Sequence, residues 1–310
     1  MLTKGKTRFG IAVPQMFPDG SIDVALISQH LKQAESLGYE SAWVQDQVTG
    51  DMPTLEPFTL LPYASTVTAK MKLGISVLVM PYRSPIHLAK ISATVDRLSQ
   101  GRLILGIGIG GGEDRYPAFG FTPEHRVTRF EEGIQLMKRL WAESKVDFQG
   151  RFWQMEKVTI KPKPLQKPHP PIWFGAHAPA ALNRAVKMGD GWMGAGSSSL
   201  RAFKESLKNM REYLAQDGRD PSTFPLAKRV YIAVDRDKEG AERKLRKWFA
   251  GYYGDGDLAV KVAFWGPEEE VIDRLGTELM TEDLDLIMFN PVYDLVDQAA
   301  KLAEDIVPKL

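Results

Sequence analysis

The sequence predicts an α/β fold, a (β/α)8 TIM barrel with insertions after strands four and seven. The 310-residue chain alternates short apolar runs with longer amphipathic ones, and eight such pairs follow one another. A doubly wound open sheet needs only five or six pairs, so the eighth pair favours a sheet that closes on itself. No internal repeat and no low-complexity tract interrupts this rhythm. We therefore expect a single barrel domain that spans residues 1–310.

The first three strands are predicted from their apolar runs. Residues 8–13 and 41–44 are typical of short strands. The helix between them ends near Gly38, a residue type that favours the position just after a helix. A second helix is predicted over residues 56–69. Residues 72–79 (KLGISVLV) are almost wholly apolar and β-branched, as in a parallel strand that is buried on both faces.

The third helix carries clear start and stop signals. Ser84 and Pro85 combine an N-cap residue with proline at the first helical position, and Gly101 follows the last turn. The apolar residues of this helix recur at helical spacing, and its expected buried stripe is Leu88, Ile91, Val95 and Leu98. The fourth strand is predicted at residues 103–108, and a further helix begins near residue 122.

Residues 146–167 break the pattern. They alternate and then become proline-rich (KPKPLQKPHPP), which predicts a hairpin and an extended excursion over the surface. The rhythm then resumes to the end of the chain. Strands are expected at residues 171–174, 191–193, 227–234 and 284–289, and helices at residues 180–188, 200–214, 239–249 and 295–306.

Composition restricts the possible functions. The 40 basic and 39 acidic residues leave a net charge of +1, and no long block of like charge indicates a nucleic-acid surface. The absence of cysteine excludes disulfides, thiolate zinc sites and a cysteine nucleophile. The longest apolar stretch falls short of the roughly 18 residues of a membrane helix, and the N-terminal residues lack the apolar run of a signal peptide. We expect a cytoplasmic protein that acts on a small molecule, without a nucleic-acid or membrane partner.

The active site of a TIM barrel is built from the loops at the C-terminal ends of the strands. The most visible of these is GIGIGGGE, from Gly106 to Glu113. Gly106, Gly108 and Gly111 match the dinucleotide pattern G-x-G-x-x-G, but that fingerprint belongs to a first βαβ unit and opens a helix directly. A loop whose bare backbone lies against a flat ligand fits this context better, with a merely flexible glycine loop as the alternative.

Two more glycine-led loops, at residues 175–178 and 194–199, each precede a helix. Free N–H groups and the helix dipole attract anions to such positions, so two adjacent loops suit a phosphate-bearing cofactor. The five histidines form neither H-x-H nor H-E-x-x-H, and no metal site is predicted. His30 is expected on a solvated helix face, and His177 beside the proposed phosphate loop. Without metal ligands or a G-x-S-x-G nucleophile, such a barrel borrows its chemistry from an organic cofactor.

Four segments spread over nearly the whole chain carry a family likeness. They are GYESAWVQDQ (residues 38–47), LGISVLVMPYRSPIHLAKISATVDRLSQGRLILGIGIG (73–110), PPIWFGAHAPAALNRAVKMGDGW (170–192) and LDLIMFNP (284–291). Together they resemble the bacterial luciferase-like family of flavin- and deazaflavin-dependent oxidoreductases.

This resemblance implies where the cofactor lies. It implies a non-proline cis peptide bond between Ser76 and Val77, as a bulge behind the ring. The edge of the ring and the ribityl chain would lie against Gly108, Ile109, Gly110 and Gly111. The phosphate end would be held by Gly175, Ala176, His177 and Ala178, with Gly194, Ala195 and Gly196 nearby.

The family divides between the deazaflavin coenzyme F-420 and FMN. Residues 74–85 look more like the deazaflavin branch, which implies hydride transfer between the deazaflavin carbon and a small organic substrate. The alternative is an FMN-dependent monooxygenase, in which reduced flavin reacts with dioxygen. A second alternative is a barrel that binds flavin without turnover. Relatives are often dimers, so a homodimer is a further expectation.

One departure from the family pattern concerns the proton donor. Many members carry Asp-His at the end of strand two, whereas this chain has Asp46-Gln47. An amide cannot exchange a proton near neutral pH, so Gln47 can only orient a ligand. The remaining acid–base candidates are Asp46, Glu113, His177 or a bound water. Asp46 is preferred, because a carboxyl group in an apolar pocket retains its proton more readily, although a structural role as hydrogen-bond acceptor is equally compatible with its place.

Overall fold

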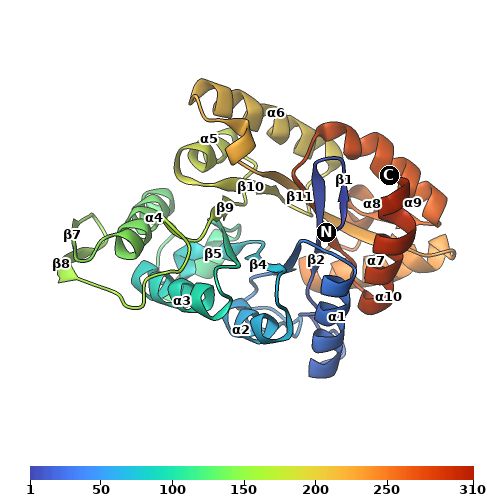
Figure 1. Ribbon diagram of the computed structural model, residues 1–310, viewed down its shortest axis with the longest axis horizontal. Helices are drawn as coiled ribbons and strands as arrows, with labels where there is room; N and C mark the ends of the chain where they lie inside the picture. The colour runs from blue at the N-terminus through green and yellow to red at the C-terminus, as the bar shows by residue number, and fades with distance from the viewer.

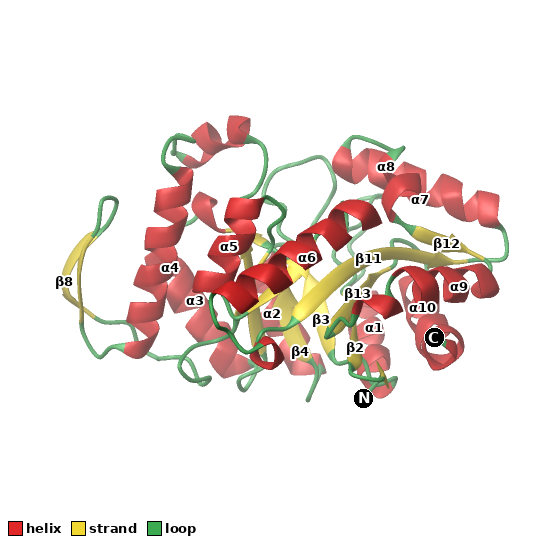
Figure 2. Cartoon of the chain, turned by 90° about the horizontal axis from the view of Figure 1, so that it is seen from above, coloured by secondary structure: helices red, strands yellow, loops and turns green.

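The computed structural model describes residues 1–310 apart from the side chain of Glu113. Eight parallel strands form a closed barrel with helices around it (Figures 1 and 2). In chain order they are β2 (Thr7–Ala12), β3 (Ser41–Val44), β4 (Lys72–Ile75), β6 (Leu103–Gly108), β9 (Ile172–Phe174), β10 (Gly191–Gly194), β11 (Leu226–Val234) and β13 (Leu286–Asn290). Parallel pairing of β2 with both β13 and β3 closes the ring. The predicted TIM barrel is confirmed.

The outer layer of helices follows the predicted alternation. The helices are α1 (Val24–Ser36), α2 (Pro57–Val67), α3 (Pro85–Leu98), α4 (Arg126–Ala142), α5 (Pro179–Met188), α6 (Leu200–Gln216), α7 (Lys238–Tyr253), α8 (Leu258–Val262), α9 (Glu268–Glu278) and α10 (Leu295–Lys301). Short 3-10 segments lie at Met80–Tyr82, Glu113–Phe119, Pro221–Thr223, Met280–Glu282 and Val307–Lys309, and a π-helical turn at Leu302–Ile306.

Both predicted insertions are present. Between β6 and β9, the chain adds the antiparallel hairpin of β7 (Val146–Gln149) and β8 (Gln154–Val158), which projects away from the barrel in Figure 1. After β11 it adds α7, α8, the short strand β12 (Phe264–Gly266) and α9, with β12 paired to the end of β11. The second insertion carries α7 to the C-terminal end of the barrel, where its last residues border the site described below.

Large aromatic side chains fill the barrel interior. Trp43 and Trp173 are buried, with ring centroids 5.4 Å apart. A Cβ at Gly74 would lie 2.2 Å from Cε3 of Trp43, and one at Gly191 would lie 2.7 Å from Nε1 of Trp173. Glycine on the neighbouring strand is therefore what allows each indole to enter the interior.

Two local predictions from the sequence are wrong. Leu98 is 58% exposed, because the buried face of α3 runs instead through Asp96, whose carboxylate accepts hydrogen bonds from the backbone N–H groups of Leu165 and Gln166. His30 is fully buried rather than solvated. Its Nε2 lies 3.0 Å from the carbonyl oxygen of Ala12, so the ring bridges α1 to the end of β2.

Candidate functional site

Two neighbouring cavities lie at the C-terminal ends of the barrel strands. The inner cavity has a volume of about 190 Å³, and the outer cavity about 530 Å³. Asp46, Ser197, Tyr252 and Tyr253 border both. The other residues of the inner cavity are Gln45, Ser76, Val77, Gly175, Met193, Ala195, Gly196 and Arg229. The other residues of the outer cavity are Gln47, Val48, Thr49, Val79, Tyr82, Gly111, Gly112, Asp114 and Arg115.

The bulge implied by the family resemblance is present. The peptide bond between Ser76 and Val77 is cis, and it separates β4 from β5 (Leu78–Val79). The Val77 side chain packs between two glycines, since a Cβ at Gly108 would lie 3.0 Å from its Cγ2 and one at Gly175 would lie 2.9 Å from it. Ser76, Val77 and Gly175 border the inner cavity, whereas Gly108 makes room for the bulge from behind.

The glycine-rich loop presents only part of itself to the cavities. Gly110 has φ +77°, and a Cβ on it would lie 2.6 Å from Cγ1 of Val79. Ile109 packs against the hydrophobic core. Gly111 borders the outer cavity, and a Cβ on it would meet none of the described atoms within 4 Å. Of the four residues predicted along the edge of the ring, Gly111 is thus the one with open space in front of it.

The predicted phosphate loop lies at the start of α5. Gly175 borders the inner cavity, and the carbonyl oxygen of Ala176 accepts a hydrogen bond of 2.9 Å from Nε1 of Trp192. His177 and Ala178 are exposed, and Ala178 is the N-cap residue of α5. The first turn of a helix of ten residues therefore faces the end of this loop, where its free N–H groups are available to an anion.

A buried lysine holds the neighbouring loop after β10. Ala195 and Gly196 border the inner cavity. Gly194 instead packs against Phe203, since a Cβ on Gly194 would lie 2.6 Å from the Phe203 ring. The ammonium group of Lys228 donates to the carbonyl oxygens of Ala195 and Ser198 and to Oγ of Ser198. Burial, helped by the charge of Arg229, lowers the pKa of Lys228 to about 7. All three ammonium protons are engaged, so Lys228 shapes the loop rather than binding a ligand directly.

Asp46 is committed to a structural contact. Its Oδ2 accepts hydrogen bonds from the backbone N–H of Val79 at 2.8 Å and from Nη1 of Arg83 at 2.7 Å, and its Oδ1 accepts one from Nη2 of Arg83 at 2.8 Å. The carboxylate side chain is only 1% exposed. The Arg83 guanidinium contacts both carboxylate oxygens, so the geometry matches the structural role considered for Asp46 and not that of a proton donor.

The other two acid–base positions differ in what the structure shows. Gln47 borders the outer cavity, and its Oε1 accepts a hydrogen bond of 3.0 Å from Oγ1 of Thr54, which fixes the orientation of the amide. Glu113 lies outside the described side chains, so its proposed role stays a prediction. Within the described part of the chain, no three His, Asp or Glu residues gather as a metal site. None of the described helices is long and apolar enough to cross a membrane.

Comparison with known proteins identifies the family. The model of the luciferase-like monooxygenase family matches residues 7–287. The chain belongs to the luciferase-like family. The family assignment made from the four sequence segments is thereby confirmed.

Relatives of this luciferase-like chain include both cofactor types. It is 31% identical over 227 residues to an F-420-dependent glucose-6-phosphate dehydrogenase from Kineococcus radiotolerans, a match covering 70% of this chain and 66% of the relative. It is 29% identical to an FMNH(2)-dependent dimethylsulfone monooxygenase from Pseudomonas putida, covering 67% of this chain and 59% of the relative. The matched region thus spans about two thirds of the first relative and less of the second.

Solved structures share the fold over nearly the full length. A monooxygenase from Streptomyces bottropensis superposes with a TM-score of 0.84 at 24% identity, covering 97% of this chain and 99% of the other. An F-420-dependent secondary alcohol dehydrogenase superposes with a TM-score of 0.83 at 19% identity, covering 98% of each chain. At these identities the likeness shows the barrel fold alone.

The luciferase-like barrel carries a buried cation that the sequence analysis did not single out. Arg229 of β11 is only 6% exposed and borders the inner cavity. Its Nε donates to Oδ1 of Asn290 at 2.9 Å, and its Nη2 donates to Oε1 of Gln45 and to the Tyr231 hydroxyl. Among the described residues, no carboxylate lies within ion-pair distance of this guanidinium. Its charge is therefore available to whatever occupies the inner cavity.

A chain of hydroxyl groups leads from Arg229 to the cavity wall. The Tyr231 hydroxyl lies 2.8 Å from that of Tyr253, and Tyr253 borders both cavities. Because arginine only donates, the Tyr231 oxygen accepts from Arg229 and its proton is available to Tyr253. Burial raises the pKa of Tyr231 well above its ordinary value and that of Tyr252 to about 12, so both stay protonated near neutral pH.

Two signals in the sequence indicate this Arg229–Tyr231–Tyr253 network. The strand LAKRVYIAV contains two consecutive cations within an otherwise apolar run, and Arg229 and Tyr231 share a face because side chains alternate along a strand. Tyr252 and Tyr253 lie beyond the end of the helix predicted at residues 239–249, whereas α7 extends to Tyr253. The shorter predicted helix left both tyrosines out of the site.

Proposed function

We propose that this chain is an oxidoreductase that transfers a hydride between coenzyme F-420 and a small organic substrate, with the whole chain acting as one barrel domain. The F-420-dependent relatives from Kineococcus radiotolerans and Nakamurella multipartita, at 31% and 27% identity, support the F-420 branch. The sequence at residues 74–85 supports the same branch. Bound F-420 supplies a carbon centre that accepts or donates a hydride.

The inner cavity would hold the ring system of the cofactor. Ser76 and Val77 would back the ring, with Met193 and the tyrosines of α7 on other walls of the same cavity. Gly111 would leave space beside the outer cavity for the ribityl chain, as a Cβ there would lie more than 4 Å from every described atom. The start of α5, with Gly175, Ala176, His177 and Ala178, would hold the phosphate, and Gly194, Ala195 and Gly196 would lie nearby.

The observation that carries the proposal is the unpaired charge of Arg229. A buried arginine without a carboxylate partner is costly, and a fixed positive charge beside a cavity stabilises negative charge that develops there. Arg229 would stabilise negative charge on the ring or on a substrate oxygen. Tyr253 would donate a hydrogen bond to the substrate oxygen, with Tyr231 holding the Tyr253 oxygen in place.

Cofactor titration tests the proposal. Purified protein is titrated with F-420 and with FMN, each oxidised and reduced, and binding is followed by fluorescence or absorbance. We expect micromolar or tighter binding of F-420 and weaker binding of FMN. Micromolar binding of FMN with none of F-420 would overturn the proposal and favour the FMN-dependent monooxygenase, which the relative from Pseudomonas putida represents.

Turnover tests the roles within the site. Reduced F-420 bound to the protein is mixed with a panel of aldehydes, ketones and enones, and its reoxidation is followed. Arg229→Met and Tyr253→Phe are expected to slow reoxidation at least tenfold, while Arg243→Met, an exposed residue of α7, leaves it unchanged. Failure of every substrate to reoxidise the cofactor would favour the barrel that binds flavin without turnover.

A further inference from the structure

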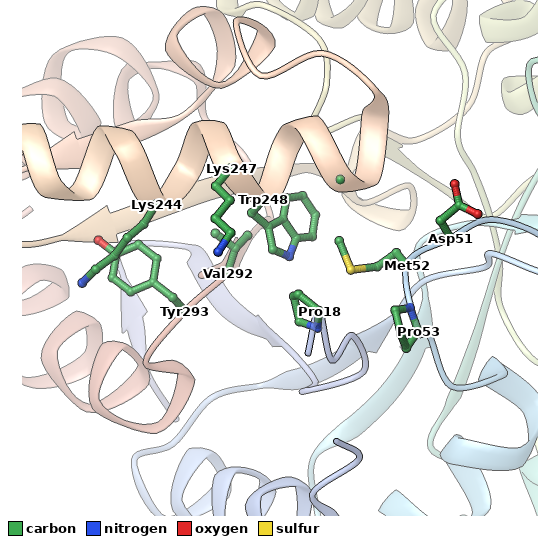
Figure 3. Close-up of a pocket in the computed structure, with 10 residues that line it drawn as sticks. Pro18, Asp51, Met52, Pro53, Lys244, Lys247, Trp248, Val292 and Tyr293 are labelled. Carbon is green, nitrogen blue, oxygen red and sulfur yellow. The ribbon is translucent and has the colours of Figure 1, made fainter. Parts of the chain in front are cut away.

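A third cavity of about 430 Å³ lies beside α7 and shares no lining residue with the inner or outer cavity. It is called the α7 cavity here and is shown in Figure 3. Its apolar surface comes from Pro18, Met52, Pro53, Trp248 and Val292, with Gly251 and the ring of Tyr293 completing it. Its volume falls in the range of small-molecule sites, roughly 300–1,000 Å³.

Each wall of the α7 cavity is held by contacts within the protein. The loop with Pro18 and the loop with Pro53 are joined by a hydrogen bond of 2.9 Å from the backbone N–H of Phe17 to the carbonyl oxygen of Pro53. On the opposite wall, Trp248 stacks on Tyr252 with ring centroids 4.9 Å apart. Since neither wall has to be ordered on binding, a ligand loses little free energy to reorganisation of the protein.

Positive charge is concentrated at one end. Lys244 and Lys247 lie one turn apart on α7 and both border the cavity (Figure 3). Lys244 lies between Asp235 and Asp294, at 3.6 and 3.8 Å. Lys247 has no ion pair with any described residue, and Figure 3 shows its amine directed toward the cavity.

The opposite end of the α7 cavity carries a negative charge. Asp51 lies there, beyond Met52, and points away from Lys247 in Figure 3. The cavity therefore presents a cation, an apolar floor with an indole, and a carboxylate in that order. A ligand with an anionic group and an apolar body would bind in one orientation, with its anion at Lys247 and its apolar part over Trp248.

Met52, on the loop after β3, contacts α7 at the edge of this cavity. A Cβ on Gly251 would lie 3.0 Å from the terminal methyl of Met52, so glycine allows the loop after β3 to touch the helix. The next residues of α7, Tyr252 and Tyr253, border the inner and outer cavities. A molecule in the α7 cavity would therefore lie next to the Tyr231–Tyr253 hydroxyl chain without entering the reaction cavities.

We propose that the α7 cavity is a second binding site, for an amphipathic monocarboxylate such as a medium-chain fatty acid. The carboxylate pairs with Lys247, and the alkyl chain covers Met52, Trp248 and Val292. The charge order of the cavity carries this assignment, and binding at this site does not require the cofactor or the proposed hydride transfer.

Calorimetric titration with decanoate tests the site, with decanol as a neutral probe that has the same alkyl chain. We expect saturable binding of one decanoate, at least tenfold tighter than decanol. Lys247→Met keeps the apolar stem but removes the charge, and it is expected to reduce decanoate affinity to that of decanol. Lys208→Met, on an exposed lysine of α6, is the matched control and should bind decanoate as the unmodified protein does.

Two further measurements place the binding in this cavity. Val292→Phe fills the cavity and is expected to abolish binding of both probes, while circular dichroism verifies that the variant is folded. Saturating F-420 should leave decanoate affinity unchanged within twofold. Equal affinity for decanoate and decanol, full decanoate affinity in Lys247→Met, or displacement of decanoate by F-420 would overturn the assignment. The proposed hydride transfer would be untouched by each of these results, since no cofactor turnover is measured.

Discussion

Replacement of Asp46 by asparagine distinguishes a structural carboxylate from a catalytic acid. The carboxylate accepts three hydrogen bonds, two of them on Oδ2 from Val79 and Arg83 and one on Oδ1 from Arg83. An asparagine with its oxygen at the Oδ2 position keeps the first two. Its NH2 group then faces Nη2 of Arg83, so that a charged hydrogen bond becomes a contact between two donors.

The magnitude follows from this count. Loss of one charged hydrogen bond costs about 1.5–3 kcal/mol, and removal of one partner of a buried ion pair about 3–5 kcal/mol. Arg83 is 18% exposed and has Glu56 at 3.7 Å as a second partner, which lowers the cost. We therefore expect Asp46→Asn to reduce the free energy of unfolding by about 2–4 kcal/mol.

Urea denaturation and turnover are measured on the same preparations. Arg83→Met and the double variant complete a double-mutant cycle, in which the double variant should lose less than the sum of the single losses because no unpaired charge remains. Asp46→Asn protein that retains its fold should bind the cofactor and turn over within tenfold of the unmodified protein. A stability change below about 0.5 kcal/mol together with a hundredfold or greater loss of turnover would refute the structural role and restore Asp46 as the acid.

Three more predictions concern the site and the buried titratable groups. Gly111→Ala should leave the free energy of unfolding unchanged but weaken cofactor binding at least tenfold. Gly110→Ala should instead destabilise the fold, because Gly110 has φ +77° and Val79 blocks a Cβ there. Unchanged cofactor affinity in Gly111→Ala would show that this loop is not part of the site. Because the pKa of Lys228 is lowered to about 7, the unfolded chain binds more protons than the folded one between pH 7 and 10.5. The free energy of unfolding should therefore rise with pH across that window, by up to about 1.4 kcal/mol per pH unit. Urea denaturation of the unmodified protein and of Lys228→Met measures this slope, which the variant should lack. Burial lowers the pKa of His30 to about 4, so the free energy of unfolding should fall as the pH drops from 6.5 to 4. His30→Gln should show a smaller fall over this range. Equal pH dependence of unfolding in the two proteins would contradict this prediction.

The barrel could be predicted from the sequence because its signals are local. Each apolar run is long enough to form a buried parallel strand, and each helix stripe recurs within a few residues. The two insertions were visible for the same reason, as a proline-rich stretch and as a charged helix between strands seven and eight. Helix α7 is longer than predicted, because residues 250–253 continue it and Tyr253 packs against Tyr231 of β11, a contact that its own spacing does not indicate.

The exact partners within the site could not be predicted, because they depend on contacts between distant segments. Asp46 is fixed by Arg83, which lies 37 residues further along the chain. The direction that each glycine faces is equally non-local: Gly108 and Gly175 both contact Val77, while Gly111 faces open space. A glycine motif indicates only positions without a side chain. Whether a ligand or another residue fills the space at such a position depends on the neighbouring strands.

Arg229 could not be predicted as a site residue for the same reason, because its partners come from distant segments. Arg229 lies on β11, and only the closed barrel brings it to Gln45, which directly follows β3, and to Asn290 of β13. Their amide oxygens hold the guanidinium without neutralising it, in a place where a carboxylate would have stabilised the protein more simply. A core selected for stability alone would have replaced this group by an apolar side chain or paired its charge, so the charge is best explained by the ligand that shares the inner cavity with it. Lys228, on the adjacent position of β11, holds the loop after β10 that borders the same cavity, so a single strand supplies both the charge and the support of this wall.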